Sequence, residues 1–176
     1  MKKILSKIIR SRILLFTVVF TLFVNITPTH SMNSIPNAFA FSTEEVECIT
    51  EAVYFEARGE SLIGRKAVIE VILNRMENPS RFSSTACGVV KQYKQFSYRG
   101  IKNLVIKDQK LYDQIRIEVK DHLYKVSILG KRSERVVKSC SNHYDGKTSN
   151  AHWIKSMTHS QQIGNHIFYC DKGDLS

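Results

Sequence analysis

The sequence predicts a mostly α-helical protein with a small β-rich part at its C-terminus, an α+β fold class. Two observations carry this prediction. Apolar residues recur at helical spacing over residues 42–78 and 108–127, whereas the chain from residue 141 onward has loops, short strands and a β-like run at residues 163–170. No internal repeat is present. A single domain rather than a repeat array is therefore expected.

The first 40 residues differ in composition from the rest and are interpreted as a secretory signal peptide. Five basic side chains precede an apolar run over residues 13–26, and no acidic residue occurs before Glu44. Ala38-Phe39-Ala40 matches the small-residue pattern of a cleavage site. The apolar run is shorter than the roughly 20 residues of a spanning helix; an uncleaved membrane anchor is the alternative. Either way, residues 41–176 are expected to be exported, to the periplasm or the medium.

Two helices are predicted at the start of the exported part. Ser42 and Glu45 have the spacing of a capping box, which opens a helix that Gly59 interrupts. A second helix is expected from near Ser61 to the stop at residues 78–79, Asn-Pro.

A loop, a short helical turn and a long helix follow. Residues 81–88 are interpreted as a loop, with a turn of helix beginning at Val89, and residues 92–107 as a second loop. Asp108 then caps a long helix to about Ser127, with Gly130 as its expected stop.

Composition and charge exclude several classes of protein. With 43% hydrophobic and 24% charged residues, the 176-residue chain is neither collagen-like, low-complexity nor wholly disordered. The net charge of +10 is concentrated in the leader and in residues 91–138, which hold 13 basic and 5 acidic side chains. Such a basic section suits an anionic polymer or a solvated helix face. No nucleic-acid partner is expected, because no binding motif is present and the chain is exported.

The exported part contains four cysteines, and none of them lies in a C-x-x-C pair. Disulfides are therefore favoured over a zinc ribbon or a redox centre. Three connectivities are open; local pairing favours Cys48–Cys87 and Cys140–Cys170, each contributing about 2–4 kcal/mol. Metal ligation is not expected, because the histidines show neither H-x-x-x-H nor H-E-x-x-H spacing.

The densest group of candidate functional residues is the segment from Glu51 to Glu60, EAVYFEARGE, in which Glu56 lies where the first helix breaks. A carboxyl group beside Tyr54 and Phe55 is partly desolvated, which raises its pKa and suits a general acid. If the helix continued through Gly59, Glu56 and Glu60 would be i,i+4 neighbours whose repulsion favours protonation of one. The structural alternative places Glu56 on the surface and pairs Glu60 with a nearby arginine.

Several blocks of this chain resemble one family. They are EAVYFEARGESLIGRKAVIEVILNRMENPSRF, TACGVVKQYKQFS, SNHYDGKTSNAHWI and IGNHIFYC, in this order. Together they resemble the SleB-type cell-wall hydrolases, the spore-cortex-lytic enzyme family, across nearly all of residues 44–170. The resemblance implies a lysozyme-like single catalytic domain at residues 41–176.

The resemblance also implies the chemistry. Family members cleave the β-1,4 bond between N-acetylmuramic acid and N-acetylglucosamine in peptidoglycan glycan strands, as hydrolases or lytic transglycosylases, without a cofactor. The first Glu of E-A-R-G-E, here Glu56, is the implied general acid, and Glu60 is the candidate second carboxylate. A monomer is expected. Side chains proposed to contact or surround the sugar chain are Gln92, Phe96, Ser97, Tyr98, His143, Tyr144, Trp153 and His166.

The sequence departs from the family pattern at one place and leaves two other functions open. Relatives carry a cysteine pair around Q-F-S, where this chain has Lys94 and Arg99. One alternative function is a non-catalytic module that binds the wall or another polyanion through the basic section. The other is an exported cysteine peptidase or amidase acting on peptide stems, with His143 or His166 as the partner of a free thiol.

Overall fold

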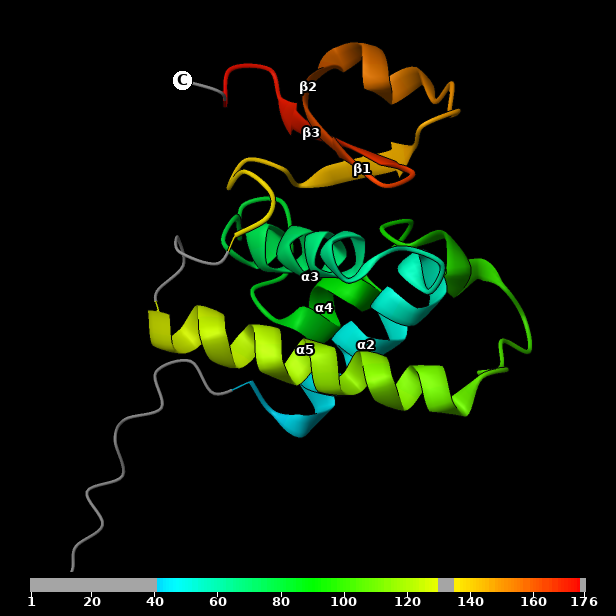
Figure 1. The fold of residues 1–176 in the computed structure, drawn as a ribbon. Coiled ribbons are helices and arrows are strands. Elements are labelled where there is room, and N and C mark those ends of the chain that lie inside the picture. The colour runs from blue at the N-terminus through cyan, green and yellow to red at the C-terminus, as the bar shows by residue number, and fades with distance from the viewer. Residues whose placement is uncertain (1–40, 130–134, 175–176) are drawn as a thin grey trace, which may run out of the picture. The chain divides into compact units, whose positions relative to one another are not determined.

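The computed structural model describes residues 41–129 and 135–174, which belong to one compact unit. Residues 1–40, predicted to be a signal peptide or a membrane anchor, lie outside the described residues. Gly130, the predicted end of the long helix, also lies outside them. The predicted fold class is confirmed, because helices come first and a small sheet comes last (Figure 1). The described elements are α2 Thr43–Ala57, α3 Leu62–Met76, α4 Ala86–Lys91, the 3-10 helix η1 Ser97–Gly100, α5 Gln109–Leu129, β1 His143–Gly146, the 3-10 helix η2 His152–Ser156, β2 Met157–Ile163 and β3 His166–Asp171.

Helix α2 carries the predicted capping box at its start. The Ser42 hydroxyl accepts a hydrogen bond from the Glu45 backbone N–H at 3.1 Å, and the Glu45 carboxylate accepts one from the Ser42 backbone N–H at 3.1 Å. The helix ends at Ala57, which leaves Glu56 in its last turn. Because the helix does not continue further, Glu56 and Glu60 are not neighbours on one helical face.

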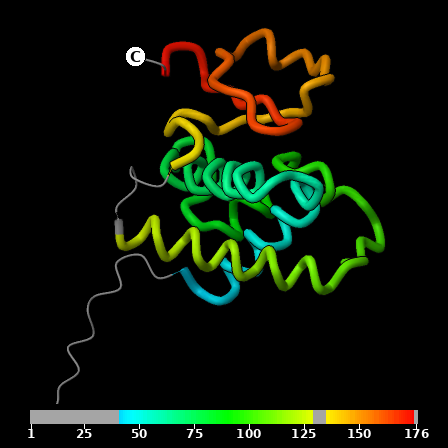
Figure 2. Tube along the Cα trace, in the orientation of Figure 1, coloured from blue at the N-terminus to red at the C-terminus, as the bar shows by residue number. Residues whose placement is uncertain are grey.

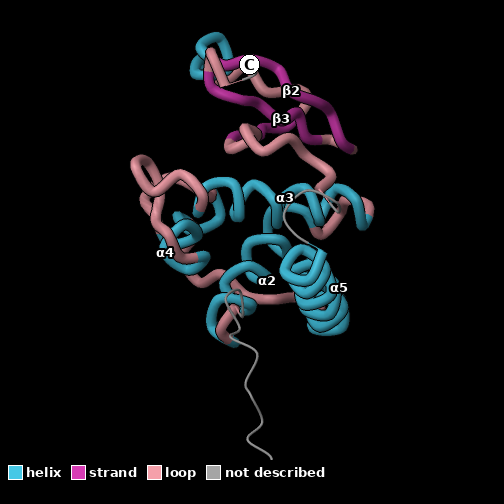
Figure 3. The backbone as a smooth tube through the Cα atoms, turned by 90° about the vertical axis from the view of Figure 1, so that its left-hand side faces the viewer, coloured by secondary structure: helices cyan, strands magenta, loops and turns pink. Residues whose placement is uncertain are grey.

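Helix α3 is the central element, and it is buried on two sides. Val68 and Ile72 pack into the main core with α2, α4 and α5, whereas Ala67 and Val71 pack on the sheet side against Phe168 of β3. Figure 3 shows the same arrangement, with the strands on one side of α3 and α2 and α5 on the other. A helix that is apolar on two faces is what a central position requires.

Helix α4 begins earlier than the sequence predicted. Residues 81–88 were expected to form a loop, but Thr85 caps α4 by accepting a hydrogen bond from the Gly88 backbone N–H at 3.1 Å. Gly88 is not a helix stop; a Cβ there would lie 1.9 Å from the Ser83 hydroxyl oxygen. The glycine therefore serves a close approach between the helix and the turn before it.

Helix α5 is capped as predicted and runs along the opposite side of the helical layer from the sheet (Figure 2). The Leu111 backbone N–H donates to the Asp108 carboxylate at 2.9 Å. Ile115, Val119 and Leu123 on its inner face are buried in the main core. None of the helices in residues 41–129 and 135–174 is long and apolar enough to cross a membrane.

The three strands form an antiparallel sheet in the order β1-β3-β2. The β-like run predicted over residues 163–170 is two strands rather than one. Ile163 ends β2, Gly164 and Asn165 make the turn, and Ile163 pairs with His166 at the start of β3. Gly164 has a φ of +59°, a backbone conformation that glycine adopts without strain, and this allows the tight hairpin.

Two disulfides tie the fold together, in the pairing that the sequence favoured. Cys48–Cys87 joins α2 to α4, and Cys140–Cys170 joins the segment before β1 to β3. The second bond lies beside the strand that lines the cleft described below. It therefore ties the chain that leads into β1 to β3.

Candidate active site

A cleft of about 830 Å³ lies where the end of α2 meets the sheet. It brings together most of the side chains that the sequence singled out, although they are spread over more than a hundred residues. The predicted residues that line it are Glu56, Gln92, Phe96, Ser97, His143, Tyr144, Trp153 and His166. The lining residues that sequence reasoning did not assign to a site are Arg75, Lys91, Tyr93, Lys94, Gln95, Arg99, Gly100, Asp145, Gly146 and Met157.

Glu56 projects from the last turn of α2 into this cleft. Its Oε2 accepts a hydrogen bond from the Tyr144 hydroxyl at 3.2 Å. Its Oε1 is buried and has no hydrogen-bond partner within residues 41–129 and 135–174. Because Tyr144 donates to Oε2, a proton on Glu56 belongs on Oε1.

The surroundings of Glu56 favour its neutral form. Desolvation by burial raises the pKa of Glu56 above its ordinary value, and the negative charge of Asp145 raises it further. The hydrogen bond from Tyr144, the nearby Tyr98 backbone and the positive charge of Arg75 lower this pKa without cancelling the rise. A carboxyl group of this kind keeps its proton at higher pH than an exposed one, as a general acid must.

This raised pKa leads to a prediction for Glu56→Gln. At pH values above the pKa of Glu56 in the folded protein, the ionised side chain destabilises the folded state. Below its ordinary pKa of 4.5, Glu56 is neutral in both the folded and the unfolded protein and has no such effect. Glu56→Gln should therefore raise the free energy of unfolding relative to wild type, by an amount that grows as the pH increases from 4 to 8. Urea unfolding of both proteins across this range measures the difference. A constant or shrinking difference would contradict a raised pKa.

Tyr144 is held in place by the sheet side of the core. Its ring centroid lies 5.0 Å from that of His166 and 5.7 Å from that of Phe168. Burial raises the pKa of Tyr144 well above its ordinary value, and the nearby Glu56 charge raises it further. Tyr144 is therefore a neutral hydroxyl that donates to Glu56. Burial also lowers the pKa of His166, which favours the uncharged ring.

His143 and Trp153 form a second aromatic part of the cleft. Their ring centroids lie 5.6 Å apart, and the Trp153 ring also meets the edge of Tyr169 at 5.5 Å. Burial and the positive charges of Arg75 and Arg81 lower the pKa of His143 to about 4, although Asp171 opposes this. At neutral pH, His143 is therefore an uncharged ring. Aromatic faces of this kind suit the C–H faces of pyranose rings.

The loop between α4 and η1 forms the rim of the cleft. Ser97 is exposed there, whereas Phe96 is only 3% exposed and is part of the main core as well as of the lining. Gln92 donates from its Nε2 to the Arg81 backbone carbonyl at 3.1 Å. Tyr98 is placed differently from the others: it is not among the lining residues and stacks on Phe55 at 5.0 Å.

Glu60 is directed away from the cleft. Its carboxylate accepts hydrogen bonds from the Asn165 backbone N–H at 3.2 Å and from Asn165 Nδ2 at 3.0 Å. A Cβ on Gly164 would lie 1.9 Å from Glu60 Oε2, so the β2–β3 turn is fitted to this carboxylate. Desolvation raises the pKa of Glu60, but the Asn165 hydrogen bonds and nearby positive charges outweigh it and lower the pKa overall. Glu60 is an ionised group that secures a hairpin rather than the arginine partner considered from the sequence.

Among the charged lining residues that sequence reasoning did not assign to the site, Arg75 and Asp145 are the two that act on Glu56. Arg75 is 4% exposed and lies in the last turn of α3, where the sequence pattern showed only a charged residue within an apolar stripe. Asp145 lies in β1, and its carboxylate accepts hydrogen bonds from the Gly146 backbone N–H and the Ser149 hydroxyl, both at 2.7 Å. The signal that could have found them is their position inside two of the blocks that resemble the family, EAVYFEARGESLIGRKAVIEVILNRMENPSRF for Arg75 and SNHYDGKTSNAHWI for Asp145.

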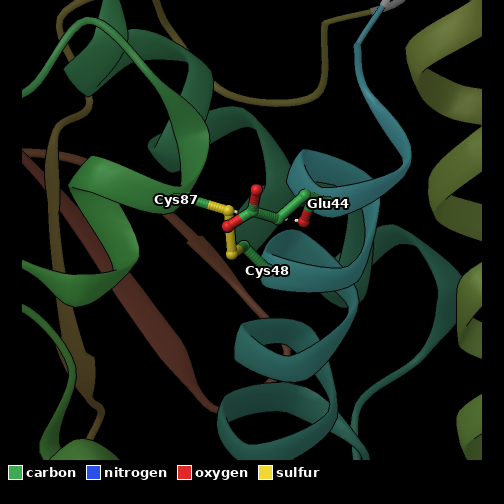
Figure 4. Close-up of side chains that lie close together, drawn as sticks. All are labelled: Glu44, Cys48 and Cys87. Carbon is green, nitrogen blue, oxygen red and sulfur yellow. Dashed lines mark hydrogen bonds between the residues drawn. A yellow bond between two sulfur atoms is a disulfide. The ribbon is translucent and has the colours of Figure 1, made fainter.

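One group of metal-ligating residue types occurs within the described residues: Glu44, Cys48 and Cys87 (Figure 4). The two sulfur atoms are bonded to each other, so neither is a thiolate that can bind a metal. Glu44 is paired with Lys91 at 3.3 Å. The group is a disulfide beside an exposed ion pair.

Comparisons with known proteins show which family this chain resembles. A spore cortex-lytic enzyme from Halalkalibacterium halodurans is 28% identical over 129 residues, which cover 73% of this chain and 35% of that protein. A spore cortex-lytic enzyme from Bacillus cereus is 26% identical over 144 residues, which cover 82% of this chain and 50% of that protein. The chain thus spans about a third to a half of the length of these relatives.

Solved structures extend the similarity to three dimensions. The catalytic domain of the Bacillus cereus SleB protein aligns with a TM-score of 0.59 and 26% identity, over 77% of this chain and 94% of that chain. The catalytic domain of the germination-specific lytic transglycosylase SleB from Bacillus anthracis also aligns with a TM-score of 0.59 and 26% identity, over 78% and 100%. The cell wall hydrolase family model matches residues 59–169, most of the described part of the chain. The chain belongs to the cell wall hydrolase family.

Proposed function

We propose that this protein cleaves the glycan strands of peptidoglycan, at the β-1,4 bond between N-acetylmuramic acid and N-acetylglucosamine, with Glu56 as the general acid. The observation that carries the proposal is a carboxyl group whose pKa is raised by burial, in a cleft lined with aromatic, amide and hydroxyl groups. Family membership and the similarity to the SleB catalytic domains support it.

The chemistry begins with proton transfer from Glu56 to the glycosidic oxygen. The bond between C1 of the muramic acid and this oxygen breaks, and positive charge develops on C1 and the ring oxygen. Tyr144 continues to donate to Glu56, which stabilises the carboxylate that remains. The carboxylate then accepts a proton from the group that attacks C1.

That attacking group decides the product. If the 6-hydroxyl of the same muramic acid attacks, a 1,6-anhydro ring forms and the enzyme is a lytic transglycosylase, which needs no second carboxylate. If water attacks, the product has a reducing end, and a second carboxylate would position the water or stabilise C1. Glu60 does not face the cleft, so Asp145 is the carboxylate that the structure offers for this role.

Glycan strands freed of their stem peptides provide the test. The purified protein should shorten such strands, because the proposed bond lies entirely within the sugar chain. Shortening is followed by size-exclusion chromatography and mass spectrometry. Intact strands, with activity only on peptide-bearing material that releases free stems, would contradict the proposal.

Glu60→Gln is predicted to retain activity. The cleft does not include Glu60, and Gln keeps an acceptor oxygen for Asn165. We expect a peptidoglycan cleavage rate within about threefold of wild type, and a small loss of stability of about 1 kcal/mol or less. Initial rates of turbidity loss and urea unfolding measure both. A rate loss as large as that of a Glu56 variant would return Glu60 to the catalytic residues.

Of the two alternative functions, the cysteine peptidase or amidase is rejected and the non-catalytic wall-binding module is separated by experiment. All four cysteines are in disulfides, so the cysteine peptidase or amidase has no thiol nucleophile and is rejected. A non-catalytic wall-binding module would bind peptidoglycan without making new chain ends, and the strand-shortening test separates the two. The disulfides also support export, which we propose delivers the protein to the periplasm or the medium.

A further inference from the structure

Arg75 is a buried cation that the proposed reaction has not yet used. Its Nε donates to the Asn142 backbone carbonyl at 2.8 Å, and its guanidinium carbon lies 5.5 Å from the Phe82 ring centroid and 5.2 Å from that of Phe96. The side chain is 4% exposed, and its Nη1 is buried without a hydrogen-bond partner in the described part of the chain. The backbone and the two rings therefore fix the charge in one place.

A buried charge normally needs an ion pair to offset its loss of hydration. Among residues 41–129 and 135–174, no carboxylate lies within ion-pair distance of Arg75. The guanidinium nevertheless stays charged at neutral pH, because burial lowers the pKa of Arg75 only to about 10. The protein thus places a positive charge on the wall of the cleft that also holds Glu56, without a direct contact between them.

The separation between these two groups matters for the chemistry. A direct ion pair would hold Glu56 as a carboxylate and leave it without a proton to donate. A cation at a longer distance leaves burial as the dominant influence, so the pKa of Glu56 stays raised before the reaction. Once the proton has left, Glu56 is negative, and its electrostatic attraction to this cation becomes stronger.

We propose that Arg75 is a positioning residue of the reaction: its fixed positive charge stabilises the carboxylate that Glu56 becomes on donating its proton to the glycosidic oxygen. This rests on the proposed function. In the first step, the proton moves from Glu56 to the leaving oxygen, and Arg75 lowers the energy of the resulting anion. In the second, the attacking hydroxyl or water returns a proton to Glu56, and Arg75 keeps its own protons throughout.

The other groups that face Glu56 set the background for a test. Tyr144 and Asp145 approach it from β1, and the Tyr98 backbone approaches it from η1. Tyr144 and Tyr98 stay neutral because burial raises the pKa of each. Arg75 and Asp145 are therefore the two fixed charges near Glu56, and they have opposite signs.

The test is the pH profile of cleavage at low peptidoglycan concentration, whose basic limb reports the loss of the Glu56 proton. Arg75→Met should move this limb to higher pH by about one unit and lower the maximal rate about tenfold or more. Arg75→Lys keeps the charge and should leave the limb near its wild-type position. Asp145→Asn should move it to lower pH.

Arg81→Met is the matched control for loss of one positive charge. The guanidinium carbon of Arg81 lies 5.4 Å from the centroid of the same Phe82 ring, but the Arg81 side chain is 43% exposed and paired with Asp171. Water screens such a charge, so this variant should leave the limb in place. A purely structural role of Arg75 would lower the rate in both Arg75 variants without moving the limb, and that result would overturn the proposal.

A second measurement does not depend on activity. The carboxyl resonance of Glu56, followed by NMR in ¹³C-labelled protein, should titrate at higher pH in Arg75→Met than in wild type. If Arg75→Met does not fold, replacement of Arg75 by citrulline removes the charge and keeps the planar group and its Nε donor. An unchanged Glu56 titration overturns the role of Arg75, whereas a wild-type protein that cuts no glycan overturns the proposed function instead.

Discussion

Replacing Glu56 with Gln is expected to lower the rate of peptidoglycan cleavage by about 100- to 10,000-fold, the usual contribution of a general acid. Gln has nearly the same shape as Glu, and its amide oxygen can still accept the hydrogen bond from the Tyr144 hydroxyl. It has no acidic proton to donate to the glycosidic oxygen. The loss should appear in the maximal rate rather than in binding of the variant to peptidoglycan. Turbidity loss and a co-sedimentation assay measure these two quantities separately.

Two controls make this result specific to Glu56. Glu60→Gln changes the same residue type four positions away and should stay near the wild-type rate, because its carboxylate faces the β2–β3 turn. The Glu56→Gln protein should also be at least as stable as wild type at pH 7, which excludes misfolding as the cause. A Glu56→Gln protein that cuts within about threefold of wild type would show that another group donates the proton.

Removal of the Cys140–Cys170 disulfide is expected to lower both the stability of the protein and its rate of cleavage. It closes a loop of 30 residues in sequence separation, so its loss should lower the free energy of unfolding by about 3–4 kcal/mol. Cys170 is fully buried in β3, and β1 beside it carries Tyr144. Cys140→Ala/Cys170→Ala should therefore also lose cleavage rate at temperatures where it is still folded. Urea unfolding and initial rates check both effects.

The Cys48–Cys87 bond is the matched comparison. Its sequence separation is 39, so Cys48→Ala/Cys87→Ala should lose a similar free energy. It joins α2 to α4, two helices, and includes no residue of the sheet. The folded fraction of the Cys48→Ala/Cys87→Ala variant should keep more activity than the folded fraction of the Cys140→Ala/Cys170→Ala variant. Equal losses of rate in both double variants would contradict a specific role of the sheet in positioning Tyr144.

The elements that the sequence predicted well are those with local signals. The capping box of Ser42 and Glu45 and the cap at Asp108 involve residues three positions apart, so the helix starts follow from short-range spacing. The start of α4 was missed because Gly88 is typical of a loop. Gly88 is needed because Ser83 packs closely against it, and the spacing of residues in the sequence does not reveal such a contact.

The site was predictable only in part, for the same physical reason. Glu56 was identified from its motif, and its raised pKa follows from burial that the neighbouring aromatic residues suggested. Glu60 was a candidate second carboxylate because it lies four residues from Glu56 in sequence, and its hydrogen-bond partner Asn165 lies 105 residues away, beyond the reach of local patterns. Arg75 and Asp145 gain their significance from closeness to Glu56 in space. Such long-range relations appear only when the sheet is placed against α3.

Mass spectrometry of the new chain ends made in purified peptidoglycan tests the central claim most directly. The wild-type protein should produce new muramic acid ends, either 1,6-anhydro or reducing, and folded Glu56→Gln should produce almost none at the same concentration and time. New ends within the peptide stems, or equal numbers of new sugar ends from both proteins, would contradict glycan cleavage by Glu56.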